Sequence, residues 1–231
     1  MTIHISATLA ALTASVALAL PAHAGDAWTG AYVGASLGAG HLSTDQYSPG
    51  QTVNDSYYGG YQVDPYGGFH PYGGLQAGLD WQLGTAVLGV RAQLLGTASP
   101  GDSLTKAEEI VTANAVALTT LSARAGYLFQ PDLLGYVNAG VVAAHFNYSS
   151  VDERWDQVDD SLDAIRTGWT IGAGLEYRLA ESISVFGEYN HVQFHTATST
   201  FDYGTSGYIP HWTYEYTHAL GTVQAGLNFR F

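Results

Sequence analysis

The feature that most constrains this sequence is a repeated alternation of apolar or small residues with polar ones. On residues 217–231 the odd positions are apolar or small, and the even positions are mostly polar and include Arg230. Successive side chains of a β-strand point to opposite faces, so this pattern predicts a strand with one apolar and one polar face. Eight segments of this kind are predicted, at residues 28–42, 73–84, 86–98, 115–129, 134–148, 165–179, 182–196 and 217–231.

The connections between these segments alternate in length. Residues 84–85, 130–132 and 180–181 are tight turns, and the long connections are residues 43–72, 99–114, 149–164 and 197–216. Transmembrane barrels have short periplasmic turns and long extracellular loops. The pattern therefore predicts an all-β fold, an eight-stranded antiparallel transmembrane β-barrel in the outer membrane with both termini in the periplasm.

Soluble β-sandwiches and lipocalin-like barrels also show alternation, and they are the alternative fold class. A soluble barrel turns its polar face to water. Here the parity that carries the charges is also rich in glycine, as expected for side chains that must fit inside a narrow closed sheet. This difference favours the membrane barrel.

The polar parity of the predicted strands carries most of the ionic residues. A buried ion must be paired or hydrogen-bonded, because its desolvation costs several kcal/mol. The interior of an eight-stranded barrel is just wide enough for side chains to fill. We therefore expect an ion-pair network that plugs the lumen, with a gated path for small ions as the alternative. Its expected members are Asp80, Arg91, Arg124, Glu176, Arg178, Glu188 and Arg230.

Aromatic residues occur in two settings, the ends of strands and the long loops. Those at strand ends are candidates for the aromatic girdle at the membrane interface, and they are Trp28, Trp81, Tyr127, Phe129, Tyr177, Phe229 and Phe231. Tyrosine with glycine is typical of recognition loops, although such rings also rest at the lipid headgroup level. The candidates for loop interaction are Tyr58, Tyr66, Tyr72, Trp155, Tyr208 and Trp212.

The N-terminus has the features of an export signal. An apolar run at residues 7–20 is followed by Pro21 and by the small-x-small sequence Ala22-His23-Ala24. We predict cleavage after Ala24, which leaves residues 25–231 as a single barrel domain; a short N-terminal helix is the alternative. Beyond this run no stretch of about 20 apolar residues occurs, so no transmembrane helix is expected in the mature chain.

Composition narrows the function. The formal net charge is −13, which argues against nucleic-acid binding, and cysteine is absent, which removes thiolate chemistry and disulfides. Residues 152–163 contain six acidic residues, but their spacing does not match a calcium-binding loop with its central glycine. We expect a solvated acidic loop that collects divalent ions loosely, and we predict no cofactor and no specific metal site.

The sequence offers little for catalysis. His191 and His195 are four residues apart on a strand, about 13 Å by strand rise, which is too far for one metal ion. The residues closest to the His and Ser of eight-stranded lipid A deacylases are His211-Trp212-Thr213, with Thr in place of Ser. Asp159-Asp160 is similar to the paired acids of outer-membrane proteases, but that class has more strands and a His-Asp pair. We predict that the protein is not an enzyme.

The chain resembles the small immunogenic outer-membrane proteins of the opacity-protein and OmpA-like porin group. The residues that carry this resemblance span the mature chain, at 28–34, 73–78, 87–90, 168–177, 187–189 and 223–231. One departure is Arg91, where family members commonly have an acidic residue after the Val-Leu-Gly-Val stretch. The long loops at 43–72 and 149–164 are this chain's own, so no ligand preference carries over.

The resemblance also implies how the protein reaches the membrane. The barrel-assembly machinery recognises a last strand that ends in Phe, which corresponds here to Leu227, Phe229 and Phe231. The expected partners are this machinery, periplasmic chaperones, outer-membrane lipid and lipopolysaccharide, and a host or surface ligand at the loops. The expected function is a non-enzymatic barrel that supports envelope integrity and presents surface loops. A narrow porin-like channel is the alternative, and a lipid-modifying barrel enzyme is the third class.

Overall fold

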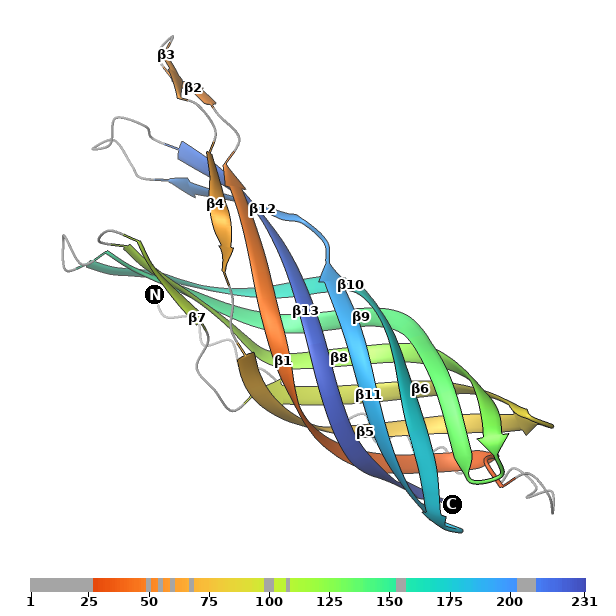
Figure 1. Ribbon diagram of the computed structural model, residues 1–231. Coiled ribbons are helices and arrows are strands. Elements are labelled where there is room, and N and C mark those ends of the chain that lie inside the picture. The colour runs from red at the N-terminus through yellow and green to blue at the C-terminus, as the bar shows by residue number, and fades with distance from the viewer. Residues whose placement is uncertain are drawn as a thin grey trace, which may run out of the picture.

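The structure is a computed structural model, and its architecture is entirely of strands and turns in the parts that it describes (Figure 1). The described residues are 27–48, 51–53, 56–58, 61–66, 69–97, 102–106, 109–152, 157–202 and 211–231. The predicted signal peptide, residues 1–24, lies outside them, so its cleavage stays a prediction. In the described part of the chain, no helix is long and apolar enough to cross a membrane.

Eight antiparallel strands form a closed barrel, which confirms the predicted fold. The last strand pairs with the first, from Tyr32 opposite Arg230 to Tyr47 opposite Glu215, and this pairing closes the sheet. In their order around the barrel the strands are β1 (Gly30–Ser48), β5 (Phe69–Leu83), β6 (Ala86–Thr97), β8 (Glu109–Gln130), β9 (Leu133–Asp152), β10 (Gln157–Ala180), β11 (Ile183–Phe194) and β13 (His211–Arg230).

The two ends of the barrel differ. The turns β5–β6, β8–β9 and β10–β11 are short and lie at one end together with the C-terminus, at the lower right of Figure 1. At the first of these turns Gly84 has a φ of +66°, a left-handed conformation that glycine adopts without a steric cost. The long connections leave the barrel at the opposite end, which we call the hairpin end.

The predicted long loops are largely β-structure, which corrects the boundaries expected from the sequence. Barrel strands run on beyond the barrel, and β9 and β10 stay paired as far as Asp152 opposite Gln157. The shorter strands β4 (Tyr61–Tyr66), β7 (Asp102–Lys106) and β12 (Ala197–Asp202) pair with β1, β8 and β13. A separate hairpin joins β2 (Gln51–Val53) to β3 (Ser56–Tyr58). Pairing satisfies backbone groups that would otherwise need other partners.

The alternation in the sequence becomes an alternation of inward and outward side chains. Outward positions are apolar, and Leu37, for example, is 75% exposed on the side that meets lipid. The inward positions hold the ionic and amide side chains. Phe186, Val192 and Phe194 on β11 have the same parity as Glu188 and also point inward.

Inward aromatic rings pack over glycines of the next strand. A Cβ on Gly174 would lie 2.7 Å from the ring of Tyr136, so this position has room only for glycine. The rings of Tyr32 and Phe186 lie in the same way over Gly78 and Gly226. The glycine-rich parity of the strands therefore makes space for large side chains inside a narrow barrel.

Most of the predicted girdle residues face outward at the short-turn end, with one correction. Tyr127 packs edge-on against Phe129, and Phe229 packs edge-on against Phe231, all on the outer surface. Trp28, in contrast, is fully buried inside the barrel, where its indole N–H donates to the Pro131 carbonyl at 2.9 Å. Trp28 precedes the start of β1, so the alternation of inward and outward residues along a strand does not fix the orientation of its side chain.

Candidate functional site

The centre of the lumen is crossed by ion pairs between strands that are far apart in the sequence. Arg124 of β8 donates from Nε to Asp80 of β5 at 2.8 Å, and from Nη1 to Glu176 of β10 at 2.8 Å. Its Nη2 also pairs with the second oxygen of Asp80. All three side chains are shielded from solvent. One guanidinium therefore ties three strands together across the interior.

A second arginine joins the last strand to β5 and to Trp28, just before β1. Arg230 donates to Asp80 at 2.9 Å and to the carbonyl of Trp28 at 2.7 Å, and its Nη2 lies 3.7 Å from Glu176. The guanidinium also lies over the rings of Trp28 and Tyr32, 5.4 and 5.2 Å from their centroids. These cation–π contacts replace part of the hydration that the charge has lost.

The third arginine forms a separate pair. Arg91 of β6 makes two hydrogen bonds of 2.8 Å to the two carboxylate oxygens of Glu188 on β11. Glu188 also accepts from Tyr136 at 2.8 Å, Asn190 at 2.7 Å and Gln224 at 2.8 Å. A carboxylate with five donors is well stabilised as an anion without water.

Arg178 does not join this interior group. It pairs with Asp132 of the β8–β9 turn at 2.7 Å, and the two side chains are 18% and 49% exposed. Arg178 has the expected inward parity, but its place near the end of β10 puts it at the mouth of the barrel. Three arginines and three carboxylates pair across the centre of the lumen, and the charges of these six residues balance.

A set of amide side chains, which the sequence analysis did not single out, extends the network toward the hairpin end. Gln76 donates to Asn228 at 2.6 Å, and Gln93 donates to Gln224 at 3.0 Å. Asn138 donates to Asn190 at 3.1 Å. These amide residues have the same inward parity as the charged residues of their strands, and this parity could have identified them from the sequence.

Apolar clusters lie inside the barrel on both sides of the polar centre. On β6, for example, Val87 lies toward the short turns, Arg91 and Gln93 lie in the middle, and Leu95 lies toward the hairpin end. The cluster at the short-turn end contains Trp28, Val87, Leu134 and Tyr136. The cluster at the hairpin end contains Leu42, Tyr72, Leu95, Leu118, Val142, Ala144, Val192 and Phe194.

This arrangement corrects the prediction for Tyr72, which was assigned to a surface loop. Tyr72 is an inward residue of β5, and its hydroxyl donates to the Val223 carbonyl at 3.4 Å. Tyr58, Tyr66 and Trp212 lie on β3, β4 and β13, respectively. Trp155 and Tyr208 lie outside the described residues. A role in interaction stays a prediction for these five residues.

The acidic segment 152–163 lies where β9 and β10 extend beyond the barrel, and its residues 153–156 are outside the described part. The register between β9 and β10 shifts between Val158 and Ser161, so Asp159 and Asp160 occupy a bulge. Within the described ranges no three His, Asp or Glu side chains gather in a cluster that could hold a metal ion.

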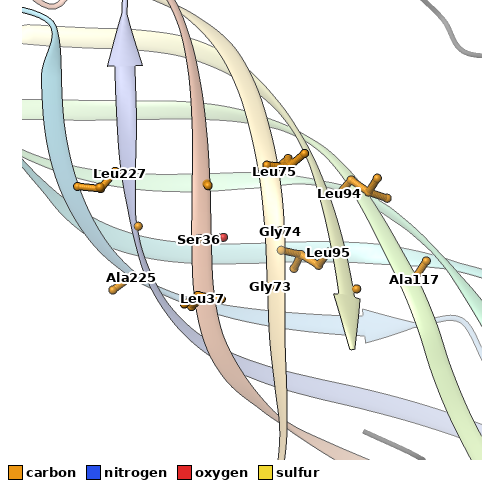
Figure 2. A pocket seen from close by; sticks show the side chains of 13 residues that line it. Ser36, Leu37, Gly73, Gly74, Leu75, Leu94, Leu95, Ala117, Ala225 and Leu227 are labelled. Atoms are coloured by element: carbon orange, nitrogen blue, oxygen red, sulfur yellow. The ribbon is translucent and has the colours of Figure 1, made fainter. Parts of the chain in front are cut away.

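One hollow of about 720 Å³ lies on the outer surface, across β13, β1, β5 and β6 (Figure 2). Small residues such as Gly73, Gly96 and Ala225 form it, and outward leucines such as Leu75 and Leu94 border it. This surface faces lipid, and the residues that line it include no acid and no base; Ser36 lines it, but its hydroxyl donates inward to Gln224 at 3.3 Å. The candidate functional features are therefore the interior network and the hairpin end, not this hollow.

Comparison with known proteins decides the family. The sequence profile described as "Outer membrane protein beta-barrel domain" matches residues 10–231. The chain belongs to this outer-membrane β-barrel family. The short turns of such barrels face the periplasm, so the hairpin end is the outer one. The outer-membrane location predicted from strand alternation is confirmed.

Relatives in Brucella melitensis and Brucella suis carry the name 31 kDa outer-membrane immunogenic protein. Each is 27% identical over 215 residues, which cover 88% of this chain and 84% of the relative. This agrees with the predicted resemblance to small immunogenic outer-membrane proteins.

Solved structures show the same kind of fold at low identity. The outer-membrane protease OmpT from Escherichia coli matches with a TM-score of 0.51 and 9% identity, over 91% of this chain and 99% of that one. OprG from Pseudomonas aeruginosa matches with a TM-score of 0.49 and 9% identity, over 88% of this chain and 97% of that one. At such identities the likeness concerns the fold and not the activity.

Proposed function

We propose that this protein is a non-enzymatic barrel with a closed lumen that supports the integrity of the outer membrane and carries long β-hairpins outside it. The observation that carries the proposal is the interior itself. The space where a channel would run is occupied by the Arg91–Glu188 pair, the ionic cluster of Arg124, Arg230, Asp80 and Glu176, an amide layer and two apolar clusters.

The chemistry of the interior supports a structural role. Breaking a buried ion pair leaves an uncompensated charge, at a cost of about 3–5 kcal/mol. Opening a path would require Arg91 and Arg124 to leave their partners Glu188, Asp80 and Glu176 together. A path that needs several such breaks is costly, so the network favours a rigid structural link between strands over a gate.

The hairpin end supports the second part of the proposal. β1, β8, β9, β10 and β13 extend beyond the barrel, and β4, β7 and β12 pair with three of these extensions. Paired strands hold their tips at a fixed distance from the membrane, which a flexible loop does not. Surface display is therefore built on continuous strands of the barrel.

The surroundings of His191 and His195 support a non-enzymatic role. The ring of His191 packs against Trp169, with centroids 5.8 Å apart. His195 Nδ1 contacts the Thr167 carbonyl at 2.9 Å. These partners are a ring and a backbone oxygen, and neither is a nucleophile or an acid.

The test is single-channel conductance of the refolded protein in a planar bilayer. We expect a silent bilayer after insertion has been verified by the change in gel mobility between heated and unheated samples. A variant with Arg124→Gln and Glu176→Gln serves as the comparison. Reproducible, salt-dependent openings of the unmodified protein that change in this variant would contradict the closed lumen and favour the narrow channel.

Envelope integrity is tested separately in cells. A deletion strain is expected to be more sensitive to detergent and more permeable to large antibiotics than its parent. Complementation with the intact gene restores resistance. Unchanged sensitivity and permeability in the deletion strain would contradict the integrity role but would leave the closed lumen standing.

A further inference from the structure

At the hairpin end the closed sheet divides into two arms. The first arm consists of the extensions of β1 and β13, with β4 and β12 beside them, and the second consists of the extensions of β8, β9 and β10, with β7 beside β8. Figure 1 shows the arms as separate groups of strands, the first toward the top and the second toward the left. The residues of the first arm are 44–48, 61–66, 197–202 and 211–216, and those of the second are 102–106, 109–115, 146–152 and 157–164.

Pairing between neighbouring strands stops at the base of the arms. The last paired residues of β10 and β11 are Gly168 and Phe194, and one more backbone bond joins the His195 N–H to the Thr167 carbonyl at 3.0 Å. Beyond that point β10 stays with β9, and β12 stays with β13. On the other side of the barrel, β5 is paired with β6 only from Tyr72 onward. Each arm therefore has two edge strands, β4 and β12 in the first arm and β7 and β10 in the second.

Three of the four edge strands carry features that discourage a further strand. An edge presents backbone N–H and C=O groups that can pair with another chain, and proteins protect such edges with proline, charge, short length or a bulge. β4 contains Pro65, which has no N–H, and its register with β1 is irregular. β10 has the bulge at Asp159 and Asp160. β7 has five residues, with the charged Asp102 and Lys106 at its ends.

The fourth edge strand, β12, has none of these protective features. Its residues from Ala197 to Asp202 pair one by one with β13, without a register shift. They include no proline, and their one charged residue, Asp202, is at the end of the strand. Thr198, Thr200 and Phe201 are residue types that favour strands. Among the edges of the described arms, β12 therefore offers the most regular backbone for a further strand.

The edge of β12 lies outside the membrane. β12 begins at Ala197, fourteen residues after β11 begins at Ile183 near the short-turn end. Fourteen residues span about 46 Å along a strand, or about 33 Å across a membrane at a tilt of about 45°, and the apolar band of such barrels is about 25 Å tall. Thr198 is exposed. A segment of another protein can therefore reach this edge from the outside.

The two arms carry a strongly negative charge. Among their described residues, Lys106 is the one lysine, and arginine does not occur. Arg166 lies deeper on β10, opposite the buried Ala144. Such a surface attracts cationic segments and repels anionic ones, a second copy of this chain included. The acidic residues of the arms are Asp45, Asp64, Asp102, Glu109, Asp152, Asp159, Asp160, Asp163, Asp202 and Glu215.

We propose that the hairpin end binds an extended, cation-rich polypeptide segment, which adds as a further strand to the open edge of β12. In this mode of recognition, backbone hydrogen bonds to the edge supply affinity and side chains supply specificity. Here the acidic residues of the arms select lysine and arginine. The proposal rests on the display of hairpins in the proposed function and names the chemistry of the partner, and it does not depend on whether the lumen conducts.

The experiment measures the fluorescence anisotropy of a labelled synthetic peptide during titration with the refolded protein in a neutral detergent. The peptide alternates lysine with threonine. Two matched peptides separate backbone pairing from charge. One carries a methyl group on each backbone nitrogen, so it keeps its charge but has no N–H to donate, and the other has glutamate in place of lysine. We expect the unmodified peptide to bind at least about tenfold more tightly than either, which corresponds to about 1.4 kcal/mol.

Three results of this titration would overturn the proposal, and none of them requires a variant of the protein to fold. Equal binding of the methylated peptide would show that charge alone holds the segment. Equal binding of the glutamate peptide would show that the arms do not select cations. No binding of the lysine–threonine peptide would remove the site itself. The conductance and permeability tests of the proposed function are read separately, so a failure there is distinguishable from a failure here.

The position of the added strand is tested with single cysteines, because the chain has no cysteine of its own. Ser199→Cys places a thiol on β12, and the matched controls Ser103→Cys and Ser161→Cys place one on β7 and β10. A lysine–threonine peptide with one central cysteine is expected to form a disulfide with the β12 variant several-fold faster than with either control.

Two outcomes of the cross-linking would contradict the assigned edge. Equal rates on the three strands, or a faster rate on a control, would overturn β12 as the site of strand addition. Disulfides between two Ser199→Cys barrels, formed in the absence of peptide and as fast as those with it, would assign the edge to a second copy of the chain and overturn the cationic segment as its partner.

Discussion

The substitution Glu188→Gln tests how strongly the interior charges hold the barrel together. Gln has nearly the shape of Glu, so the change removes the negative charge and leaves the packing. Glu188 is the only carboxylate that bonds Arg91 among the described residues, through two hydrogen bonds of 2.8 Å. Because the Arg91 side chain is 3% exposed, water does not replace the lost charge. We expect a loss of about 3 kcal/mol in the free energy of unfolding, as for other buried pairs with one partner removed.

The assay is urea unfolding of the refolded protein in lipid vesicles, followed by tryptophan fluorescence and by gel mobility of unheated samples. Asp132→Asn is the matched control, because Asp132 also accepts two hydrogen bonds from one arginine, Arg178, but is half exposed. An exposed pair contributes about 0–1 kcal/mol, so this variant is expected to unfold close to the unmodified protein. Arg91→Met with Glu188→Gln removes both charges and is expected to recover part of the loss.

The comparison of the stability losses in Glu188→Gln and Asp132→Asn shows whether the charge of Arg91 is shielded from water. If Glu188→Gln costs no more than Asp132→Asn, the charge on Arg91 is hydrated, and the lumen holds enough water to screen it. That result would refute the closed interior on which the structural role rests. A large loss of stability in Glu188→Gln that the double variant does not recover would instead indicate packing damage. The double variant also removes the cation of Arg91, so a loss caused by that unpaired charge would be partly recovered.

Two further predictions concern glycine packing and assembly. Gly174→Ala places a methyl group against the Tyr136 ring and is expected to lower the free energy of unfolding in urea by about 1–3 kcal/mol. Gly187→Ala, with nothing within 4 Å of the added methyl group, is expected to change this free energy by less than about 0.5 kcal/mol. Equal effects of the two variants would contradict the ring-over-glycine packing. Phe231→Ala is expected to lower the folded fraction of the protein in isolated outer membranes several-fold. Phe129→Ala, which removes a similarly exposed aromatic side chain at the same end, is not expected to lower this fraction. Similar losses in both variants would show that lipid anchoring, and not a terminal signal, determines the folded fraction.

The barrel could be predicted from the sequence because lipid and lumen impose opposite demands on alternate residues. On residues 169–179 of β10 and 219–229 of β13 every other position is apolar or small, and the inward positions of these strands carry Glu176, Gln224 and Arg230. A shift of one residue would put those groups in lipid, so the sequence specifies the register strongly. The same logic placed the interior carboxylates and arginines on one side of the sheet.

The residues at strand ends were harder to predict, because parity stops guiding them there. Trp28 precedes β1 and turns inward to reach the Pro131 carbonyl, a contact with a residue 103 positions away. Arg178 has the right parity but meets Asp132 of the β8–β9 turn. These choices depend on which groups the closed barrel brings together, and such groups are not neighbours in the sequence.

The long connections were misread for a related reason. Their Gly, Tyr and Ser content is typical of loops, yet extended chains beside one another pair wherever backbone groups lack partners. Tyr72 was assigned to such a loop because it lies in a Pro-Tyr-Gly-Gly repeat. Counting back from Gln76 and Asp80 by twos would have placed it on the inward face of β5.

The cross-lumen pairs also constrain the order in which the barrel can be completed. A chain that has delivered β1 to β9 to the membrane already contains Arg91 and Arg124, but Glu176 and Glu188 arrive only with β10 and β11. Arg230, at the end of β13, then binds Asp80 and the Trp28 carbonyl, near the beginning of the described chain. Of the six interior ionic residues, a partly inserted sheet therefore holds Arg91, Arg124 and one carboxylate, Asp80, so their charges balance only on full closure. Half-built barrels are left poorly stable, which favours an all-or-none final step over the accumulation of open sheets.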